Sequence, residues 1–117
     1  MINDKNRLYL FWLIGKYVFQ KQESYANVFF VVSNFLSYYY GMSNTYTRYN
    51  IKMMRNFYCC FPNFISEMNK LHWEHYLRLV TVSDFKERYF YFRIAIFCRS
   101  NVRDLQCMID NKLYEVI

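Results

Sequence analysis

The chain has 117 residues, a length that fits one small domain, 1–117, and leaves too little chain for two independent cores. It is 55% hydrophobic and 23% aromatic with only two glycines and one proline, which excludes a disordered or loop-rich chain and favours a compact all-α bundle. Its formal charge of +6 favours an acidic partner, whether nucleic acid, an anionic membrane surface or an acidic protein.

Two helices are expected in the first third of the chain. The first covers about Asp4 to Gln22, and its aromatic face is predicted to lie in the core. The second covers roughly Tyr25 to Tyr40, although its β-branched and consecutive aromatic residues also fit a strand. Gly41 follows where a left-handed helix cap is wanted. The residues predicted to face inward in the second segment are Val28, Val31 or Val32, Phe35 and Leu36.

A third helix is expected between Tyr46 and Pro62. The Thr47 hydroxyl can cap its start, and Pro62 disfavours helical geometry at the residue before it. With the preceding helix and the polar turn at 43–45, it forms a helix-turn-helix-like pair, although any helical bundle contains such pairs. Its buried side is predicted from residues that recur at three- and four-residue spacing: Ile51, Met54, Phe57 and Tyr58.

The same helix has a basic side. Arg48, Lys52 and Arg55 share helical spacing, and no Asp or Glu between Glu23 and Glu67 is available to neutralise them. Such a carboxylate-free basic side is the electrostatic footprint expected of a surface that meets phosphate. The alternative is a solvated basic face beside the core.

The second half of the chain predicts a short turn or helix at 63–69, followed by three helices. One covers Leu71 to Val80, and the next covers Asp84 to about Cys98 with Ser83 as its N-cap. The last runs from Val102 to about Glu115 and is capped by Asn101. The predicted inward residues of the three helices are Trp73, Tyr76, Leu77 and Val80, then Phe85, Tyr89, Phe92 and Ile96, then Val102, Leu105, Ile109 and Leu113.

Chemistry-bearing residues are few. His72 and His75 are three residues apart, but a zinc site needs three or four ligands, so His75 is predicted to be a hydrogen-bonded structural residue. No hydrolase pattern, glycine-rich phosphate loop or dinucleotide fingerprint is present, so we expect no catalysis by this chain, no metal and no cofactor. The four cysteines are expected to be reduced and mostly buried: Cys59, Cys60, Cys98 and Cys107.

The apolar stretches predict no membrane span. Leu8–Phe19 and Ala26–Leu36 are too short and too interrupted by polar residues to cross a bilayer. The polar start Met1–Arg7 and the absence of a small-residue cleavage site give no sign of a secretory signal peptide. We therefore expect a cytoplasmic protein, in a bacterium or in the host of a phage that encodes it.

Several blocks resemble a known family, the N-terminal helical domain of bacterial YhcG-like proteins, which usually precedes a nuclease domain of the PD-(D/E)XK type. The similarity runs from about Leu8 to the end of the chain, and the order and spacing of the blocks make it specific. It implies a helical domain that is presumed to bind DNA. The blocks are Trp12–Tyr17, Ser33–Leu36, Tyr46–Pro62, Leu71–Tyr76, Glu87–Tyr91 and Val102–Leu105.

The chain also departs from that family. Met42 to Thr45 replaces a shorter glycine-containing turn, and Ser100 stands where the family has a tryptophan. The chain ends near where the family's linker to the nuclease begins, so we expect a domain that stands alone without the nuclease.

Two functions of different classes are expected. The first is a non-catalytic nucleic-acid-binding module for DNA or RNA. The second is a phage or mobile-element inhibitor of a bacterial defence nuclease, similar in role to an anti-CRISPR protein, which binds a Cas-type nuclease or its guide or substrate. A decayed remnant or an oligomerising scaffold is a third option. The predicted contact residues are Arg48, Tyr49, Asn50, Lys52, Arg55 and Asn56, with Lys86 and Arg93 on a separate helix.

Overall fold

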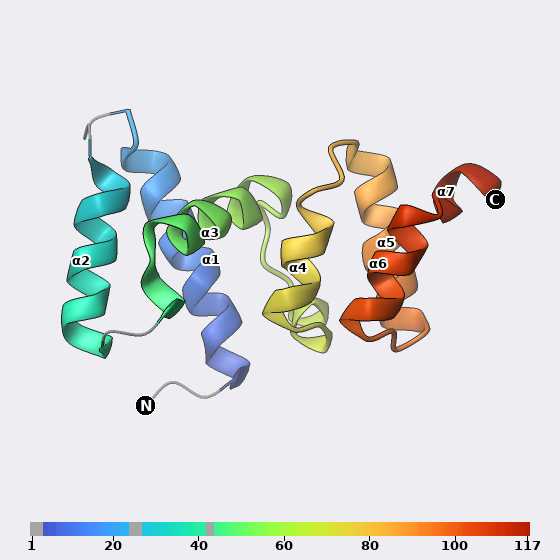
Figure 1. Cartoon of the computed structure of the whole chain (residues 1–117), viewed down its shortest axis with the longest axis horizontal. Helices are drawn as coiled ribbons and strands as arrows, with labels where there is room; N and C mark the ends of the chain where they lie inside the picture. The colour runs from blue at the N-terminus through green and yellow to red at the C-terminus, as the bar shows by residue number, and fades with distance from the viewer. Residues whose placement is uncertain (1–3, 24–26, 42–43) are drawn as a thin grey trace. The chain divides into compact units, whose positions relative to one another are not determined.

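A computed structural model describes residues 4–23, 27–41 and 44–117. Over these ranges every regular element is a helix and no strand occurs, so the all-α prediction is confirmed (Figure 1). Contacts divide the chain into two compact units, Met1–Phe64 and Ile65–Ile117. The first unit contains α1 Asp4–Lys21, α2 Val28–Tyr40, the 3₁₀ turn η1 Asn44–Tyr46 and α3 Arg48–Cys60. The second contains η2 Ser66–Lys70, α4 Trp73–Leu79, α5 Phe85–Phe97, α6 Val102–Asp110 and α7 Leu113–Val116.

The first unit is built on a close crossing of α1 and α3. A Cβ atom placed on Gly15 would lie 2.0 Å from the carbonyl oxygen of Met54 and 2.5 Å from its carbonyl carbon. Only a residue without a side chain fits there, so glycine is required because any Cβ atom would clash with α3. Around the crossing the buried core of the unit is Leu8, Phe11, Trp12, Ile14, Val18, Val28, Leu36, Tyr46, Ile51, Met54 and Phe57.

Both ends of α3 are fixed as the sequence predicts. At the start, the Thr47 hydroxyl accepts a hydrogen bond from the backbone N–H of Asn50 at 3.1 Å. At the end, α3 stops at Cys60, before Pro62. The indole N–H of Trp12 then donates to the carbonyl of Phe61 at 2.7 Å, which satisfies a polar group just beyond the helix end.

The second predicted segment is a helix rather than a strand, but its inward residues are only partly as predicted. Its predicted start at Tyr25 lies outside the described residues, and the described helix begins at Val28. Val28 and Leu36 are buried, whereas Phe35 is 58% exposed and Val31 is 60% exposed. The prediction of Phe35 as core is therefore wrong, because only one narrow side of α2 meets the rest of the unit.

The turn after α2 needs its glycine. Gly41 has φ of 97°, a value that side-chain-bearing residues rarely adopt, and its N–H donates to the carbonyl of Ser37 at 2.9 Å. Its ψ of 161° is extended rather than left-handed helical, so the predicted cap differs in form. Part of the predicted polar turn, Ser43, lies outside the described residues, and Asn44 and Thr45 belong to η1.

The second unit corrects three sequence predictions. Asp84, rather than Ser83, caps α5, because its carboxylate accepts from the N–H of Glu87 at 2.9 Å. Phe85 and Tyr89, predicted to be inward, are exposed. The long last helix is interrupted, because Lys112 adopts a left-handed conformation between α6 and α7.

The side of α5 that packs into the core lies next to the side predicted from the sequence. Tyr91, Phe92 and Ala95 are its buried residues, so of the predicted set only Phe92 is deeply buried. Asn101 caps α6 as predicted, since its side chain accepts from the N–H of Asp104 at 2.7 Å. The remaining buried apolar residues of the unit are Met68, Leu71, Tyr76, Leu79, Val82 and Leu105.

Substitution of Gly15 by alanine tests the crossing. We expect the free energy of unfolding, measured by urea denaturation, to fall by about 2 kcal/mol or more, because α3 must move away from α1. In a helix without this contact, replacing glycine by alanine would stabilise the protein by ~1 kcal/mol. The sign of the change in stability therefore shows whether the two backbones are in contact. The control is the exposed residue Gln20 of α1, whose replacement by alanine should change stability by less than about 0.5 kcal/mol.

Candidate nucleic-acid interface

Positive charge is concentrated in the first unit. Residues 1–64 contain seven Lys and Arg against two Asp and Glu, whereas residues 65–117 contain eight against seven. The first unit therefore carries five of the six net positive charges of the chain. A surface that binds an anionic partner through charge is therefore to be sought in the first unit.

The predicted cations of α3 share its outward side. Ile51 and Met54 are fully buried, and this burial turns the basic side of the helix away from the core. Arg48 and Lys52 are exposed, and Arg55 is half-buried. The structure thus brings together the three cations that the spacing predicted.

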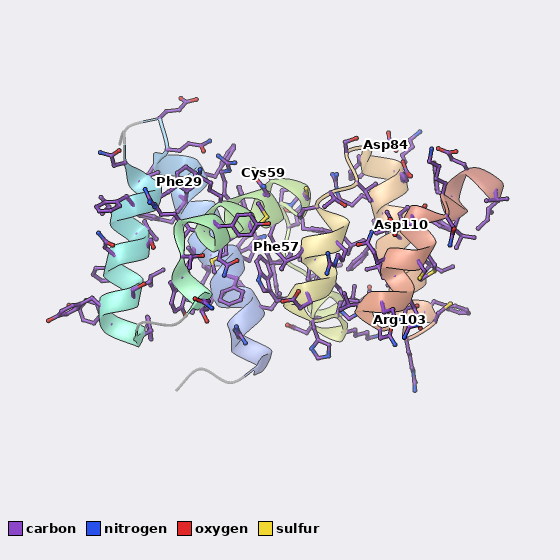
Figure 2. All side chains as sticks on the ribbon, in the orientation of Figure 1. Phe29, Phe57, Cys59, Asp84, Arg103 and Asp110 are labelled. Atoms are coloured by element: carbon purple, nitrogen blue, oxygen red, sulfur yellow. The ribbon has the colours of Figure 1, made fainter. Side chains whose placement is uncertain are left out.

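Two phenylalanines of α2 lie beside these cations. The guanidinium carbon of Arg48 is 5.6 Å from the centre of the Phe30 ring. Phe29 is labelled on α2 in Figure 2. The ammonium of Lys52 is 5.6 Å and the guanidinium carbon of Arg55 is 5.1 Å from the centre of the Phe29 ring. These are cation–π distances. We call these five residues, from α2 and α3, the cation–aromatic face.

Arg55 is held more firmly than the other two cations. Its guanidinium donates to the side-chain oxygen of Gln22 at 3.1 Å and to that of Asn56 at 3.1 and 3.3 Å. Gln22 follows α1, so Arg55 connects all three helices of the unit. Lys52 and Arg48 have no ion pair among the residues that the structure describes.

The predicted polar readers are partly engaged within the chain. The Asn50 side chain donates to the carbonyl of Asn44 at 2.6 Å, and the Asn56 side chain accepts from Arg55. Both amides therefore stabilise the conformation of the interface. Tyr49 is 66% exposed, as a stacking residue would need to be.

The family of the chain is identified by its sequence match. The family model described as the DUF1016 N-terminal domain matches residues 2–116. The chain belongs to the DUF1016 N-terminal domain family. This match extends over both units and confirms the resemblance to the N-terminal domain of YhcG-like proteins. No curated protein and no solved structure matches the chain.

Two predicted contact residues of this DUF1016 N-terminal domain belong to the second unit. Lys86 and Arg93 lie on α5, are exposed, and are not part of the cation–aromatic face that α2 and α3 build. Arg93 forms an ion pair with Glu67, and this hydrogen-bonded carboxylate raises the pKa of the guanidinium. The charge of Arg93 is therefore already partnered within the domain.

Phe29 and Phe30 belong to the cation–aromatic face but are not among the contact residues predicted from the sequence. Phe29 lies four and seven residues before the buried Ser33 and Leu36, so it shares their side of α2, and Phe30 is the next residue along the helix. Their contact with α3 could not be anticipated, because it depends on how α2 and α3 pack.

The thiols of the domain are not buried as predicted. Cys59, Cys98 and Cys107 are exposed, and Cys60 is half-buried. Partial desolvation raises the pKa of the Cys59 thiol, and the nearby Arg55 guanidinium lowers it by a smaller amount. Cys59 therefore lacks the depressed pKa that a nucleophilic cysteine needs.

His75 is a structural residue, as predicted. It is buried, its Nδ1 accepts from the backbone N–H of His72 at 3.0 Å, and its Nε2 lies 2.8 Å from the carbonyl of Ser100. With Nδ1 as acceptor, Nε2 carries the proton and donates to that carbonyl. Within the described part of the chain no cluster of three or more His, Cys, Asp or Glu side chains could hold a metal ion.

Across residues 4–23, 27–41 and 44–117, no helix combines the length and the apolar character needed for a transmembrane span.

The pH dependence of Cys59 alkylation tests its surroundings. In a chain with Cys60, Cys98 and Cys107 replaced by serine, we expect the midpoint of the rate profile with iodoacetamide to lie above that of an unstructured cysteine peptide. Replacement of Arg55 by glutamine should move the midpoint higher still, because the lowering cation is lost. A midpoint that stays fixed or moves down in this variant would contradict an electrostatic interaction between Arg55 and Cys59.

Proposed function

We propose that this domain is a non-catalytic nucleic-acid-binding module that uses the cation–aromatic face. The observation that carries the proposal is the alignment of Arg48, Lys52 and Arg55 beside Phe29 and Phe30 in a unit almost free of carboxylates. Phosphate groups would pair with the cations, and the charge excess would attract the strand from a distance.

The aromatic side chains favour a single strand over a duplex. Phe30 is 49% exposed and Tyr49 is 66% exposed, so each offers ring surface on which an unpaired base can stack. A base inside a duplex is already stacked on its neighbours. The same combination of rings and cations suits DNA and RNA alike, because every base has a π-face.

We place this activity in the cytoplasm of a bacterium, or of the host if a phage encodes the chain. The unpaired thiols of Cys59, Cys98 and Cys107 fit a reducing compartment. On this proposal the domain holds a strand and performs no reaction of its own. Any cleavage would need a catalytic partner.

A second candidate function is inhibition of a bacterial defence nuclease of the Cas type. One observation favours contact with a protein: α2 has no charged residue and exposes apolar and aromatic side chains along its outer side. Exposed patches of this kind often mark protein contacts. The most exposed of these residues are Val31, Phe35, Tyr38, Tyr39 and Tyr40.

The salt dependence of binding tests the proposed function. We expect the affinity for a fluorescent single-stranded oligonucleotide to fall with salt, with a log–log slope of about −0.7 for each phosphate contacted. Replacement of Arg48, Lys52 and Arg55 by glutamine should reduce the magnitude of the slope by about 2.

A variant of the second unit provides the matched control. Arg78, Arg103 and Lys112 are exposed cations, and their replacement by glutamine removes the same charge. We expect this variant to keep most of the slope of the unaltered chain. If both variants lose the same amount of slope, binding depends on net charge alone and the assigned face is wrong.

A cleavage assay tests the second candidate. If it holds, a purified Cas-type nuclease should lose activity as the chain is titrated to stoichiometry, and replacement of Tyr38 and Tyr39 by serine should restore cleavage. These two residues are 83% and 65% exposed, so the fold should tolerate the change. Full cleavage in the presence of about 10 μM chain argues against nuclease inhibition, since even a complex with a micromolar Kd would then be largely formed.

A further inference from the structure

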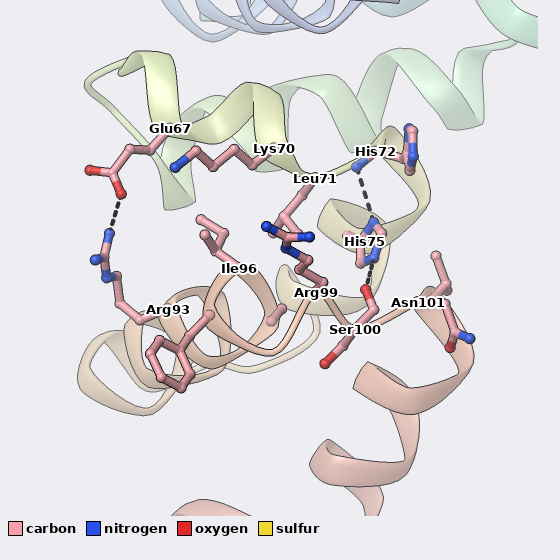
Figure 3. Close-up of a pocket in the computed structure, with 13 residues that line it drawn as sticks. Glu67, Lys70, Leu71, His72, His75, Arg93, Ile96, Arg99, Ser100 and Asn101 are labelled. Carbon is pink, nitrogen blue, oxygen red and sulfur yellow. Dashed lines mark hydrogen bonds and ion pairs between the residues drawn. The ribbon is translucent and has the colours of Figure 1, made fainter.

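The second unit contains a hollow that the proposed function does not use. Its volume is about 930 Å³, and it lies between η2, the start of α4, and the end of α5 with the turn into α6 (Figure 3). This volume is at the upper end of the range typical of small-molecule sites. Its apolar wall includes Leu71, Ala95, Ile96 and Val102.

The polar lining of the hollow is positively charged. Lys70, Arg93 and Arg99 line it together with one carboxylate, Glu67. Glu67 is committed to Arg93 through their ion pair. Among the described residues, Lys70 and Arg99 have no ion-pair partner, so two positive charges face the hollow without compensation.

Arg99 occupies a backbone position that favours glycine. Its φ is 52°, and it follows α5 in a helix-ending turn in which the N–H of Ser100 donates to the carbonyl of Ala95 at 3.0 Å. Glycine is the usual residue at this place, because a Cβ atom is strained there. In Figure 3 the guanidinium of Arg99 extends toward Leu71.

His75 fixes the walls of the hollow. Through its two ring nitrogens it bridges the backbone of His72, before α4, and the carbonyl of Ser100, next to Arg99 (Figure 3). The turn that carries Arg99 is therefore tied to the start of α4 in the absence of any ligand. A backbone held in this way does not have to be ordered when an anion binds.

We propose that this hollow binds the phosphate group of a nucleotide-sized ligand, with Lys70 and Arg99 as its contacts. A guanidinium and an ammonium together match the charge and the acceptor oxygens of a phosphate ester. The space exceeds that needed by phosphate alone, and the apolar wall gives a surface for the remainder of the ligand. The phosphate belongs either to a free nucleotide or to the end of a strand.

Calorimetric titration of the full chain tests the site. We expect AMP to bind and adenosine to bind at least about tenfold more weakly, because charged hydrogen bonds to the phosphate are lost. Tighter binding of a 5′-phosphorylated dinucleotide than of AMP would assign the phosphate to a strand end, and the reverse order would assign it to a free nucleotide. Either order supports the site.

Two glycine substitutions separate binding from folding. Arg99→Gly removes the guanidinium and relieves the backbone, so AMP affinity should fall at least about tenfold while the thermal midpoint stays equal or rises. Lys112→Gly is the matched control, because Lys112 has the same φ of 52° and the same charge but does not line the hollow. It should leave AMP affinity unchanged.

Three results would overturn the site: no AMP binding at millimolar concentration, equal affinities for AMP and adenosine, or full AMP affinity in Arg99→Gly. The site does not depend on the cation–aromatic face. Oligonucleotide binding by that face is read from its salt slope, so each proposal can fail while the other stands.

Discussion

The first unit depends on one contact, the approach of the α1 backbone at Gly15 to the α3 backbone at Met54. The carbonyl oxygen of Met54 lies where a side chain on Gly15 would have to be. This approach buries Ile51, Met54 and Phe57 against α1. Trp12 fixes the far end of the crossing through its hydrogen bond to Phe61. The position of α3 is thus set mainly by the close packing of its backbone on Gly15, and the Trp12 hydrogen bond adds to it.

The cation–aromatic face follows from that crossing. Because one side of α3 is committed to α1, its cations must face outward, where α2 supplies Phe29 and Phe30 beside them. Arg55 is oriented further by Gln22 and Asn56. The two phenylalanine rings carry no net charge, so they contact the cations without neutralising them. Cations without an ion pair can still attract phosphate. The charge of Arg93, by contrast, is already paired with that of Glu67.

Local signals predicted much of this fold and the shared side of the three α3 cations. The Thr47 cap, the Pro62 stop and the spacing of Arg48, Lys52 and Arg55 are properties of one segment, and all were predicted correctly. Aromatic residues misled the prediction, because a chain this rich in them must expose some. Thus Phe35, Phe85 and Tyr89 were assigned to the core and are exposed. The Phe29 contacts and the requirement for Gly15 arise between helices, which no single segment specifies.

An NMR titration of the full chain with a short single-stranded oligonucleotide tests most directly whether the cation–aromatic face binds a strand. We expect the largest amide shifts on the outward positions of α3, from Arg48 to Cys59, and on Phe29 and Phe30 of α2. Side-chain signals of the three arginine and lysine residues of the face should move with them. Shifts confined to the second unit, with α3 unchanged at saturation, would contradict the assignment of the interface.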